Sequence, residues 1–455
     1  MRPAIKAGLK KPIGAAKAYN EIASKIVSMA ASLLSYSEAA EQVHRFIVAL
    51  ASGGVVPGSG QATPEPARPE IVPLENAMGR VLAEGIRADR DQPPFPRSTR
   101  DGFACRASEA NSHQYLFLAG QIRAGQQTSA TVGSGEIWEI MTGAPVPQGA
   151  DCVVMLEHVE HSSNFVRQIA SRTLVPGENI VPQGAEARAG DLLIPPGMRI
   201  TTAQIAMAAQ CGYRELAVYP RPKVAILSTG DEIVPLEQTP GPSQIRNSNT
   251  PMLAAMVTAS GGTPVILPPV PDQEGALDEV IVQLLDPQFK LDMLLITGGI
   301  SVGRFDLVAD ALTRAGAAFF FGGVAIQPGK PVVFGQLPRS SQLPLPFFAL
   351  PGNPISSAVT FQLFAAPLLA ALADDTGAQP RFILASLEGE GRGKLGLTRF
   401  LPAWCDFSFE PKVRLIPWQG SGDLASFATS NCFLVVPQEA GALSEGSLVR
   451  VLLRP

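Results

Sequence analysis

In the second half of the chain, short apolar runs alternate with stretches of helical character, and this alternation constrains the fold more than any other feature. Residues 224–228 and 293–297 have the pattern of buried strands, and residues 251–260 and 274–285 have the pattern of helices. Strands and helices that alternate at this spacing predict βαβ units and a parallel sheet. We therefore expect a doubly wound α/β domain over residues 221–373.

Loops that follow the strands of such a sheet carry its candidate site, because ligands bind outside the carboxyl ends of parallel strands. Four loops rich in glycine, proline or charge qualify, at residues 228–232, 297–303, 327–331 and 350–354. A glycine-rich turn lets backbone N–H groups approach a phosphate, and Lys330, between two prolines, provides a fixed cation. The plain alternatives are an ordinary turn and a solvated surface lysine.

Four acidic residues lie at or near these strand ends, and they are Asp231, Glu232, Asp272 and Asp306. Carboxylates that converge beside a phosphate bind Mg²⁺ or act as general acids and bases. Helix N-capping is a credible alternative for each acid singly, and less so for all four. Together the loops predict an enzyme that acts on a phosphorylated substrate.

The N-terminal part of the chain predicts an extension, a helix and a linker. Residues 1–34 are basic and lack the apolar core of a secretory signal. We expect them to be a disordered extension or the result of a start codon that is assigned too early. A basic amphipathic helix and a transit peptide are the alternatives. Residues 35–51 predict a helix with Ser37 as N-cap and one apolar face, formed by Ala40, Val43, Ile47 and Leu50. Residues 52–69 form a Pro/Gly linker.

Short β-like runs separated by glycine and proline predict a β-rich domain over residues 89–190 and a C-terminal β domain over residues 374–455. The uncharged residues 355–373 are long enough to span a membrane. Pro367 and several hydroxyl and amide side chains favour instead a helix buried in the α/β core or in a dimer contact. Within 157–161, a Glu/His cluster resembles a metal site, but on a strand His158 and His161 would face opposite sides.

Composition excludes several classes of protein. The chain has 455 residues, of which 46% are apolar, which is enough for more than one core. With 17% charged residues, a net charge of −4 and 6% aromatic residues, it lacks the basic surface of a nucleic-acid protein. The five cysteines are odd in number and far apart in the sequence, which favours buried thiols in a reducing cytoplasm over disulfides or zinc.

Short motifs from residue 79 onward occur in a characteristic order, at residues 79–83, 100–104, 140–145, 177–180, 228–232, 297–303, 328–331 and 350–354. In this order they resemble the motifs of the molybdopterin molybdenumtransferases, the MoeA proteins, which are similar to the E domain of gephyrin. The resemblance covers the chain from about Ser35 to its C-terminus. It implies a molybdopterin-binding α/β domain, a linking domain (70–88 and 191–220), a β-rich lid and the C-terminal β domain.

The same resemblance implies an activity, a cofactor and partners. The reaction inserts molybdate into adenylylated molybdopterin and releases AMP, and it uses Mg²⁺ or a similar ion. Such proteins are usually homodimers in which the lid of one subunit faces the central domain of the other. We expect a cytoplasmic enzyme that contacts the molybdopterin adenylyltransferase, and no binding to nucleic acid or membrane.

The resemblance also assigns roles to matched positions. The implied catalytic residues are Asp101, Thr142, Glu232, Asp272, Asp306 and Lys330, of which Glu232 and Asp306 would hold Mg²⁺. The implied substrate-binding residues are Gly298, Gly299, Ser301, Gly303, Pro351 and Pro354. Asp101 and Thr142, from the lid, would close the site from the partner subunit.

This chain departs from the family pattern at several positions. Gln327 stands where the family often has a second lysine, which leaves a hydrogen-bonding amide in place of a charge. Arg100 and Phe103 replace the methionine and tyrosine of one lid motif, and Glu186 replaces an aspartate in another. Two alternatives to the transferase follow: the sibling adenylyltransferase, which typically has Thr-Gly-Gly-Thr-Gly where this chain reads Thr-Gly-Gly-Ile-Ser, and a non-catalytic scaffold that keeps the fold.

Overall fold

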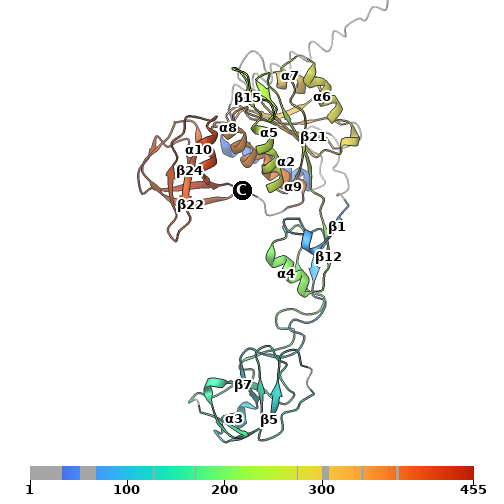
Figure 1. Ribbon diagram of the computed structural model, residues 1–455, viewed down its shortest axis with the longest axis vertical. Coiled ribbons are helices and arrows are strands. Elements are labelled where there is room, and N and C mark those ends of the chain that lie inside the picture. The colour runs from blue at the N-terminus through green and yellow to red at the C-terminus, as the bar shows by residue number, and fades with distance from the viewer. Residues whose placement is uncertain are drawn as a thin grey trace, which may run out of the picture. The chain divides into compact units, whose positions relative to one another are not determined.

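The chain folds into two compact units, which are described separately below (Figure 1). The computed structural model describes residues 33–51, 68–126, 129–169, 171–273, 275–299, 307–339, 343–375 and 379–454. One unit comprises the described residues up to Glu70, Gly79–Val81 and those from Tyr219 onward, and the other comprises Ile71–Met78 and Leu82–Val218. Residues 1–32 of the expected basic extension (1–34) and residues 52–67 of the expected linker (52–69) lie outside the described residues.

A six-stranded sheet organises the first unit, in the order β16-β13-β17-β21-β20-β18. Its strands are β13 (Lys223–Ser228), β16 (Thr263–Ile266), β17 (Met293–Thr297), β18 (Ala318–Gly322), β20 (Val333–Leu337) and β21 (Leu345–Leu350). The four strands β16, β13, β17 and β21 pair in parallel, and β20 and β18 continue the sheet in antiparallel pairs. The doubly wound α/β domain is confirmed, with an antiparallel edge that the sequence pattern did not predict.

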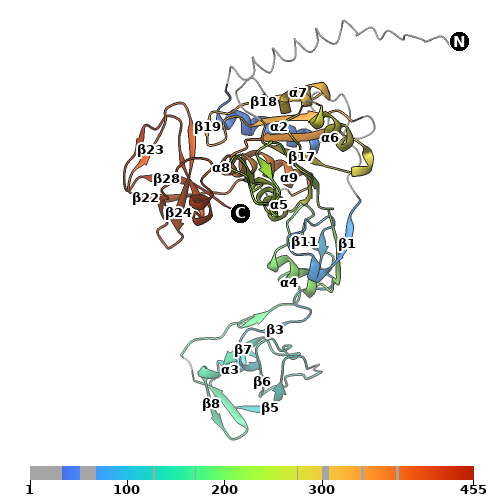
Figure 2. The ribbon, with the colours of Figure 1, turned by 45° about the horizontal axis from the view of Figure 1, so that its top comes forward.

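Helices cover both faces of this sheet, because the side chains of a buried strand alternate between the faces (Figure 2). On one face, Ile226 and Leu295 pack with α2, α5 and the helices that follow β21. On the other, Leu227 and Ile296 pack with α6 and α7. The helix bounds are α2 (Tyr36–Ala51), α5 (Asn249–Ala259), α6 (Ala276–Leu284), η3 (Pro287–Phe289) and α7 (Leu307–Arg314).

Helix α2 spans Tyr36–Ala51, but its cap and its buried face differ from the prediction. Ser35, not Ser37, caps the helix: its Oγ accepts from the N–H of Glu38 at 3.2 Å, and the Glu38 carboxylate accepts from the N–H of Ser35 at 2.7 Å. This is a capping box, in which each residue satisfies the other. The fully buried face consists of Ala39, Val43 and Phe46. The other three predicted face residues, Ala40, Ile47 and Leu50, are partly buried beside it.

The uncharged stretch after β21 is a helical segment composed of α8 (Pro354–Thr360), the π-helical η4 (Phe361–Ala365) and α9 (Ala366–Leu372). By length and composition it could cross a membrane, but 83% of its apolar window is buried inside the protein. Burial in the core therefore accounts for its apolar character. A proline ring clashes with the carbonyl four residues earlier, and for Pro367 that carbonyl belongs to Leu363, within the wider π-helical turn.

The C-terminal part of the first unit is a small β barrel. Strands β24, β25, β22, β28 and β26 pair in that order, and pairing of β24 with β26 closes the sheet. Phe400 and Phe433 of the barrel belong to the same core as the α/β helices. The bounds of its elements, and of the short strands that flank the sheet, are β14 (Ile233–Val234), β15 (Ile245–Arg246), β19 (Ile326–Gln327), β22 (Phe382–Glu388), β23 (Gly391–Arg392), β24 (Thr398–Asp406), β25 (Lys412–Leu415), α10 (Leu424–Thr429), β26 (Cys432–Val436), β27 (Ala442–Leu443) and β28 (Leu448–Leu453).

The second unit holds most of the residues of the expected linking and lid domains, whereas Glu70, Gly79–Val81, Tyr219 and Pro220 belong to the first unit. A six-stranded sheet in the order β7-β4-β6-β5-β9-β8 forms its larger part, with a core that includes Phe103 and Ile137. A smaller core around Leu82 and Ile86 packs against α4. The element bounds are β1 (Glu70–Pro73), η1 (Leu74–Asn76), β2 (Ile86–Arg87), β3 (Arg97–Ser98), β4 (Gly102–Cys105), α3 (Ala107–Ala110), β5 (Leu116–Ile122), β6 (Glu136–Ile140), β7 (Cys152–Met155), η2 (Leu156–His158), β8 (Val159–Ser162), β9 (Phe165–Gln168), β10 (Ile180–Val181), β11 (Leu192–Ile194), α4 (Thr202–Gln210) and β12 (Glu215–Val218).

Replacing Phe348 with alanine should strongly destabilise the first unit. The Phe348 ring is fully buried in β21 and stacks on Phe334 with 4.5 Å between ring centroids. Loss of a buried phenylalanine costs about 3–5 kcal/mol of unfolding free energy. Urea denaturation followed by circular dichroism measures it. Phe409, which is fully exposed, is the matched control, and Phe409→Ala should stay within about 0.5 kcal/mol of the parent. Equal effects of the two substitutions would contradict this account of the core.

Candidate functional site

The loops after β13, β17 and β21 meet at one edge of the sheet, as parallel pairing of these three neighbouring strands requires. The N–H of Thr229 donates to the carbonyl of Thr297 at 3.0 Å. A Cβ added at Gly298 would lie 2.3 Å from the carbonyl oxygen of Thr229, and one added at Gly352 would lie 3.5 Å from Cα of Gly298. The backbones of the three loops are therefore in direct contact.

Two glycines form the turn after β17. Gly298 and Gly299 have φ angles of +96° and +63°, in the region that favours glycine. A Cβ at Gly299 would lie 2.8 Å from the hydroxyl oxygen of Thr229. That hydroxyl and the amide oxygen of Asn249 are buried and have no hydrogen-bond partner among the described residues. Two buried polar atoms near the glycine turn thus lack a partner among the described residues. Ser301 and Gly303, predicted for the same turn, lie outside the described residues.

The loop after β21, with Pro351 and Pro354, is held by hydrogen bonds from its neighbours. The amide of Asn249 donates to the carbonyl of Gly352 at 2.6 Å and to the hydroxyl of Thr297 at 2.9 Å. The hydroxyl of Ser357 donates to the carbonyl of Pro351. Pro351 is buried, and Pro354 begins α8. These contacts give the loop a fixed position on the wall of the site.

Three of the four predicted acids gather on the β13 side of this edge. The carboxylate of Asp231 accepts from the N–H of Asp272 at 3.0 Å, and a Cβ at Gly230 would lie 2.6 Å from an oxygen of Glu232. Partial burial, and then the charges of Asp231 and Glu232, raise the pKa of Asp272 above its usual value. The fourth acid, Asp306, lies outside the described residues. Within the described part of the chain, no three His, Cys, Asp or Glu side chains form a metal-binding group.

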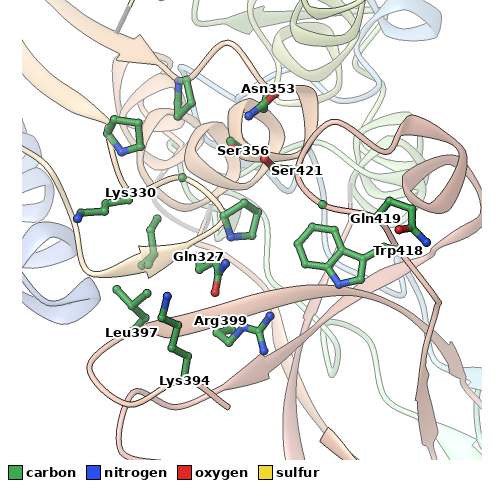
Figure 3. Close-up of a pocket in the computed structure, with 16 residues that line it drawn as sticks. Gln327, Lys330, Asn353, Ser356, Lys394, Leu397, Arg399, Trp418, Gln419 and Ser421 are labelled. Carbon is green, nitrogen blue, oxygen red and sulfur yellow. The ribbon is translucent and has the colours of Figure 1, made fainter. Parts of the chain in front are cut away.

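Next to the loop after β21, on the side of the barrel, is a cavity of about 650 Å³ (Figure 3). Lys330, predicted as a fixed cation, lines it together with Pro351. Two further cations come from the barrel, Lys394 and Arg399, and no acidic residue is among the described residues that line the cavity. The cavity is therefore suited to an anion.

Gln327 also lines this cavity, from the strand β19. That strand pairs in parallel with β24, which sets Gln327 opposite Arg399. The side-chain oxygen of Gln327 is buried and has no hydrogen-bond partner among the described residues. Gln327, which departs from the family pattern, is thus uncharged, but Arg399 of β24 lies opposite it.

Reasoning from the sequence missed the residues that the barrel adds to the cavity, which are Lys394, Leu397, Arg399, Trp418, Gln419, Gly420 and Ser421. They lie in short β runs and loops that carry no recognised motif. A usable signal was the segment 418–422, where a tryptophan precedes a polar, glycine-rich turn. Only three-dimensional pairing of β19 with β24 brings this part of the barrel to Lys330.

In the second unit, the predicted lid residues Asp101 and Thr142 are in contact. The carboxylate of Asp101 accepts from the N–H of Thr142 at 2.7 Å and from its hydroxyl at 3.0 Å. These bonds, the N–H first, hold the pKa of Asp101 below its usual value. Both residues are exposed, as is Arg100. Glu186 forms an ion pair with Arg97 at 2.7 Å.

Two further features of the lid concern its histidines and cysteines. His161 makes an edge-on contact with the ring of Phe103, with 5.1 Å between centroids, and belongs to no metal-binding group of described residues. All five cysteines are buried and free. Cys105 and Cys152, although distant in the sequence, lie opposite each other on β4 and β7 with 3.7 Å between sulfur atoms. The neighbouring Cys152 thiol, and then burial, raise the pKa of Cys105, which makes it a poor nucleophile.

Replacing Gly298 with alanine should disturb the site more than replacing Gly352. The new Cβ at residue 298 would meet the carbonyl of Thr229 and would hold a positive φ, a strain of about 1–3 kcal/mol even without the clash. At residue 352 the nearest atom is at ordinary contact distance. Thermal unfolding should show a clear loss for Gly298→Ala and almost none for Gly352→Ala. A Gly298→Ala chain as stable as the parent would contradict the close approach of the loops.

Comparison with known proteins identifies the family. The model described as "MoeA N-terminal region (domain I and II)" matches residues 34–212, "Probable molybdopterin binding domain" matches residues 225–371, and "MoeA C-terminal region (domain IV)" matches residues 379–453. These three models cover nearly all of the chain from the start of the described residues.

Relatives agree with this. A molybdopterin molybdenumtransferase of Nostoc sp. is 34% identical over 407 residues, which are 85% of this chain and 89% of the relative. A protein of the same name from Bacillus subtilis is 33% identical over 397 residues, 84% and 89% of the two chains. The crystal structure of a molybdopterin biosynthesis MoeA protein from Pyrococcus horikoshii OT3 has a TM-score of 0.73 at 27% identity, covering 93% of this chain and 100% of that one. The chain belongs to the MoeA family, as its sequence motifs predict.

Proposed function

We propose that the chain is a molybdopterin molybdenumtransferase, which inserts molybdate into adenylylated molybdopterin and releases AMP. The observation that carries the proposal is the cavity of about 650 Å³ with three cations and no acidic lining residue, next to a glycine turn at the carboxyl edge of the sheet. The name shared by the relatives from Nostoc and Bacillus subtilis supports it.

Molybdate is a dianion, and the cavity offers it three positive side chains, Lys330, Lys394 and Arg399. A guanidinium presents paired N–H donors to an oxyanion, and an ammonium acts as a compact point charge. The neutral amide of Gln327 adds hydrogen bonding without further charge. We infer that this group of residues binds the oxyanion until the dithiolene of the substrate takes up the metal.

The phosphoanhydride of the substrate fits the turn after β17. Gly298 and Gly299 leave room for backbone N–H groups to approach an anion, and the Thr229 hydroxyl beside them has no partner among the described residues. Across the sheet the order is then fixed by the strands: acids after β13, glycine turn after β17, cavity beside the loop after β21. A substrate with a phosphate link in its middle can span these three places.

The acids fit a divalent cation, and we propose Mg²⁺ held by Glu232 and Asp306, with Asp272 nearby. Carboxylate oxygens are the ligands that Mg²⁺ prefers. The raised pKa of Asp272, caused partly by two neighbouring carboxylates, reflects a repulsion that a cation would relieve. Bound Mg²⁺ would neutralise charge on the phosphoanhydride. The protein's own contribution is to hold these carboxylates together and to orient the attacking water.

The lid pair supports a proposal about assembly. Asp101 is held by Thr142 in its charged form, and both residues are exposed. We propose that they close the site from the partner subunit of a homodimer, that the enzyme is cytoplasmic, and that it contacts the molybdopterin adenylyltransferase to receive its substrate.

The reaction itself gives the first test. With adenylylated molybdopterin, molybdate and Mg²⁺, the chain should release AMP, and removal of Mg²⁺ with a chelator should suppress the release. Glu232→Gln should lower kcat by about two orders of magnitude or more while leaving substrate binding nearly unchanged, because a carboxylate that holds Mg²⁺ and orients the attacking water acts mainly in the transition state.

Glu410→Gln, an exposed change on the barrel, is the matched control and should keep full activity. Substrate binding without AMP release by the parent chain would exclude the transferase and favour a scaffold. Formation of adenylylated molybdopterin from ATP and molybdopterin would favour the sibling adenylyltransferase.

A second test concerns the oxyanion. Lys330→Ala should weaken molybdate binding about tenfold to a hundredfold, since a hydrogen bond to a charged group contributes about 1.5–3 kcal/mol. Isothermal titration with molybdate measures the change. Lys412→Ala, which removes an exposed lysine of β25 that does not line the cavity, should bind molybdate like the parent. Equal binding by the two variants would place the oxyanion elsewhere.

A further inference from the structure

The cavity beside Lys330 is larger than an oxyanion needs. Its volume of about 650 Å³ lies within the range of about 300–1,000 Å³ typical of pockets for whole small molecules. Molybdate has five heavy atoms and would fill a minor part of it. The remaining space has its own lining, to which proline rings, Leu397 and Trp418 contribute apolar surface. A second, flatter and less polar group can therefore share the cavity with the anion.

Trp418 is the one aromatic side chain among the described residues that line this cavity, and it is half-buried (Figure 3). The same side chain packs against the apolar cores of both the α/β part and the barrel. The ring is thus supported by protein and also borders the cavity. An aromatic ring that is supported in this way and borders a cavity can stack with a planar ligand.

The loop that carries Trp418 is fixed at both ends. The carboxylate of Asp423 accepts from the N–H of Gln419 at 3.0 Å and from the N–H of Ser426, at the start of α10, at 3.1 Å. The carbonyl of Ser421 accepts from the N–H of Ile355 in α8 at 3.0 Å. These bonds join the loop to the barrel and to the α/β part. A ring on such a loop loses little conformational freedom when a ligand stacks on it.

We infer that Trp418 is the stacking surface for the pterin ring system of the substrate, an inference that rests on the proposed function. The two sulfur atoms of the dithiolene must reach the molybdate, and they are joined directly to the pterin-bearing ring system. If the oxyanion lies at Lys330, the pterin lies in the same cavity. The adenine is on the far side of the phosphoanhydride, which the turn at Gly298 and Gly299 receives outside the residues that line the cavity.

Direct binding to the full chain tests this, with pterin-6-carboxylate, AMP and molybdate as separate probes in isothermal titration. Trp418→Leu keeps an apolar side chain against the two cores but removes the stacking surface. It should weaken pterin-6-carboxylate about tenfold to a hundredfold, the usual effect of losing one aromatic–heterocycle stack, and leave molybdate and AMP unchanged. Trp418→Phe retains a ring and should lose markedly less pterin affinity.

Trp404→Leu is the matched control, because Trp404 is exposed on β24 and does not line the cavity. It should bind all three probes like the parent. Pterin should also quench tryptophan emission in the parent and in the Trp404→Leu variant, but less in Trp418→Phe. Unchanged pterin affinity in Trp418→Leu, or a loss of AMP affinity in place of pterin affinity, would overturn the inference.

The inference and the proposed function can fail separately. AMP release by the parent, together with pterin binding that does not depend on Trp418, would overturn only the stacking role. Absence of AMP release would overturn the transferase, whereas a pterin affinity that falls in Trp418→Leu would still establish Trp418 as a heterocycle-binding residue.

Discussion

Parallel pairing of β13, β17 and β21 is the constraint on which the rest of the candidate site depends. Because these strands are neighbours and run in one direction, their carboxyl ends reach the same edge, and the loops that follow must share a small space. Gly298 makes that possible, since any side chain there would collide with the backbone of Thr229. The acids, the glycine turn and the wall of the cavity are thus ordered by the strand order itself.

The helical segment from Pro354 to Leu372 connects this edge of the sheet with the barrel. It starts at the loop after β21, runs through the core and is buried on nearly all sides, which explains an uncharged stretch in a chain with no other such helix among its described residues. In its first turn, the N–H of Ile355 donates to the carbonyl of Ser421, and this hydrogen bond attaches a loop of the barrel to the segment. The same segment therefore positions one wall of the cavity and attaches the domain that completes it.

Much of the α/β part was predictable from the sequence, because its signals are local. Buried strands, intervening helices and glycine turns each leave a pattern within a few residues, and the strands β13 and β17 lie where that pattern predicts them. The cap of α2 was misplaced by two residues, although the sequence does distinguish the two serines: Glu38 stands three residues after Ser35, which is the spacing of a capping box, whereas Ala40 stands three residues after Ser37. The strands of the antiparallel edge, β18, β20 and β21, lie close together in the sequence. The barrel's contribution to the cavity was missed because it depends on pairing between distant segments, such as Gln327 with Arg399.

Acidic and basic side chains lie at opposite ends of the candidate site. Acids occupy the β13 side of the sheet edge, and cations surround the cavity beyond β21, with the uncharged turn of β17 between them. If all charged side chains of the site had the same sign, they would attract one of the two ions, the metal cation or the oxyanion, and repel the other. Under the proposed function, Mg²⁺ would lie near the acids and molybdate near the cations, and a substrate with a phosphate at its centre would have one favourable orientation. Gln327 lines the same cavity as Lys330, Lys394 and Arg399, and its amide adds hydrogen-bonding groups without adding a charge. The charge that the motif lacks at residue 327 is thus matched by cations that the barrel contributes.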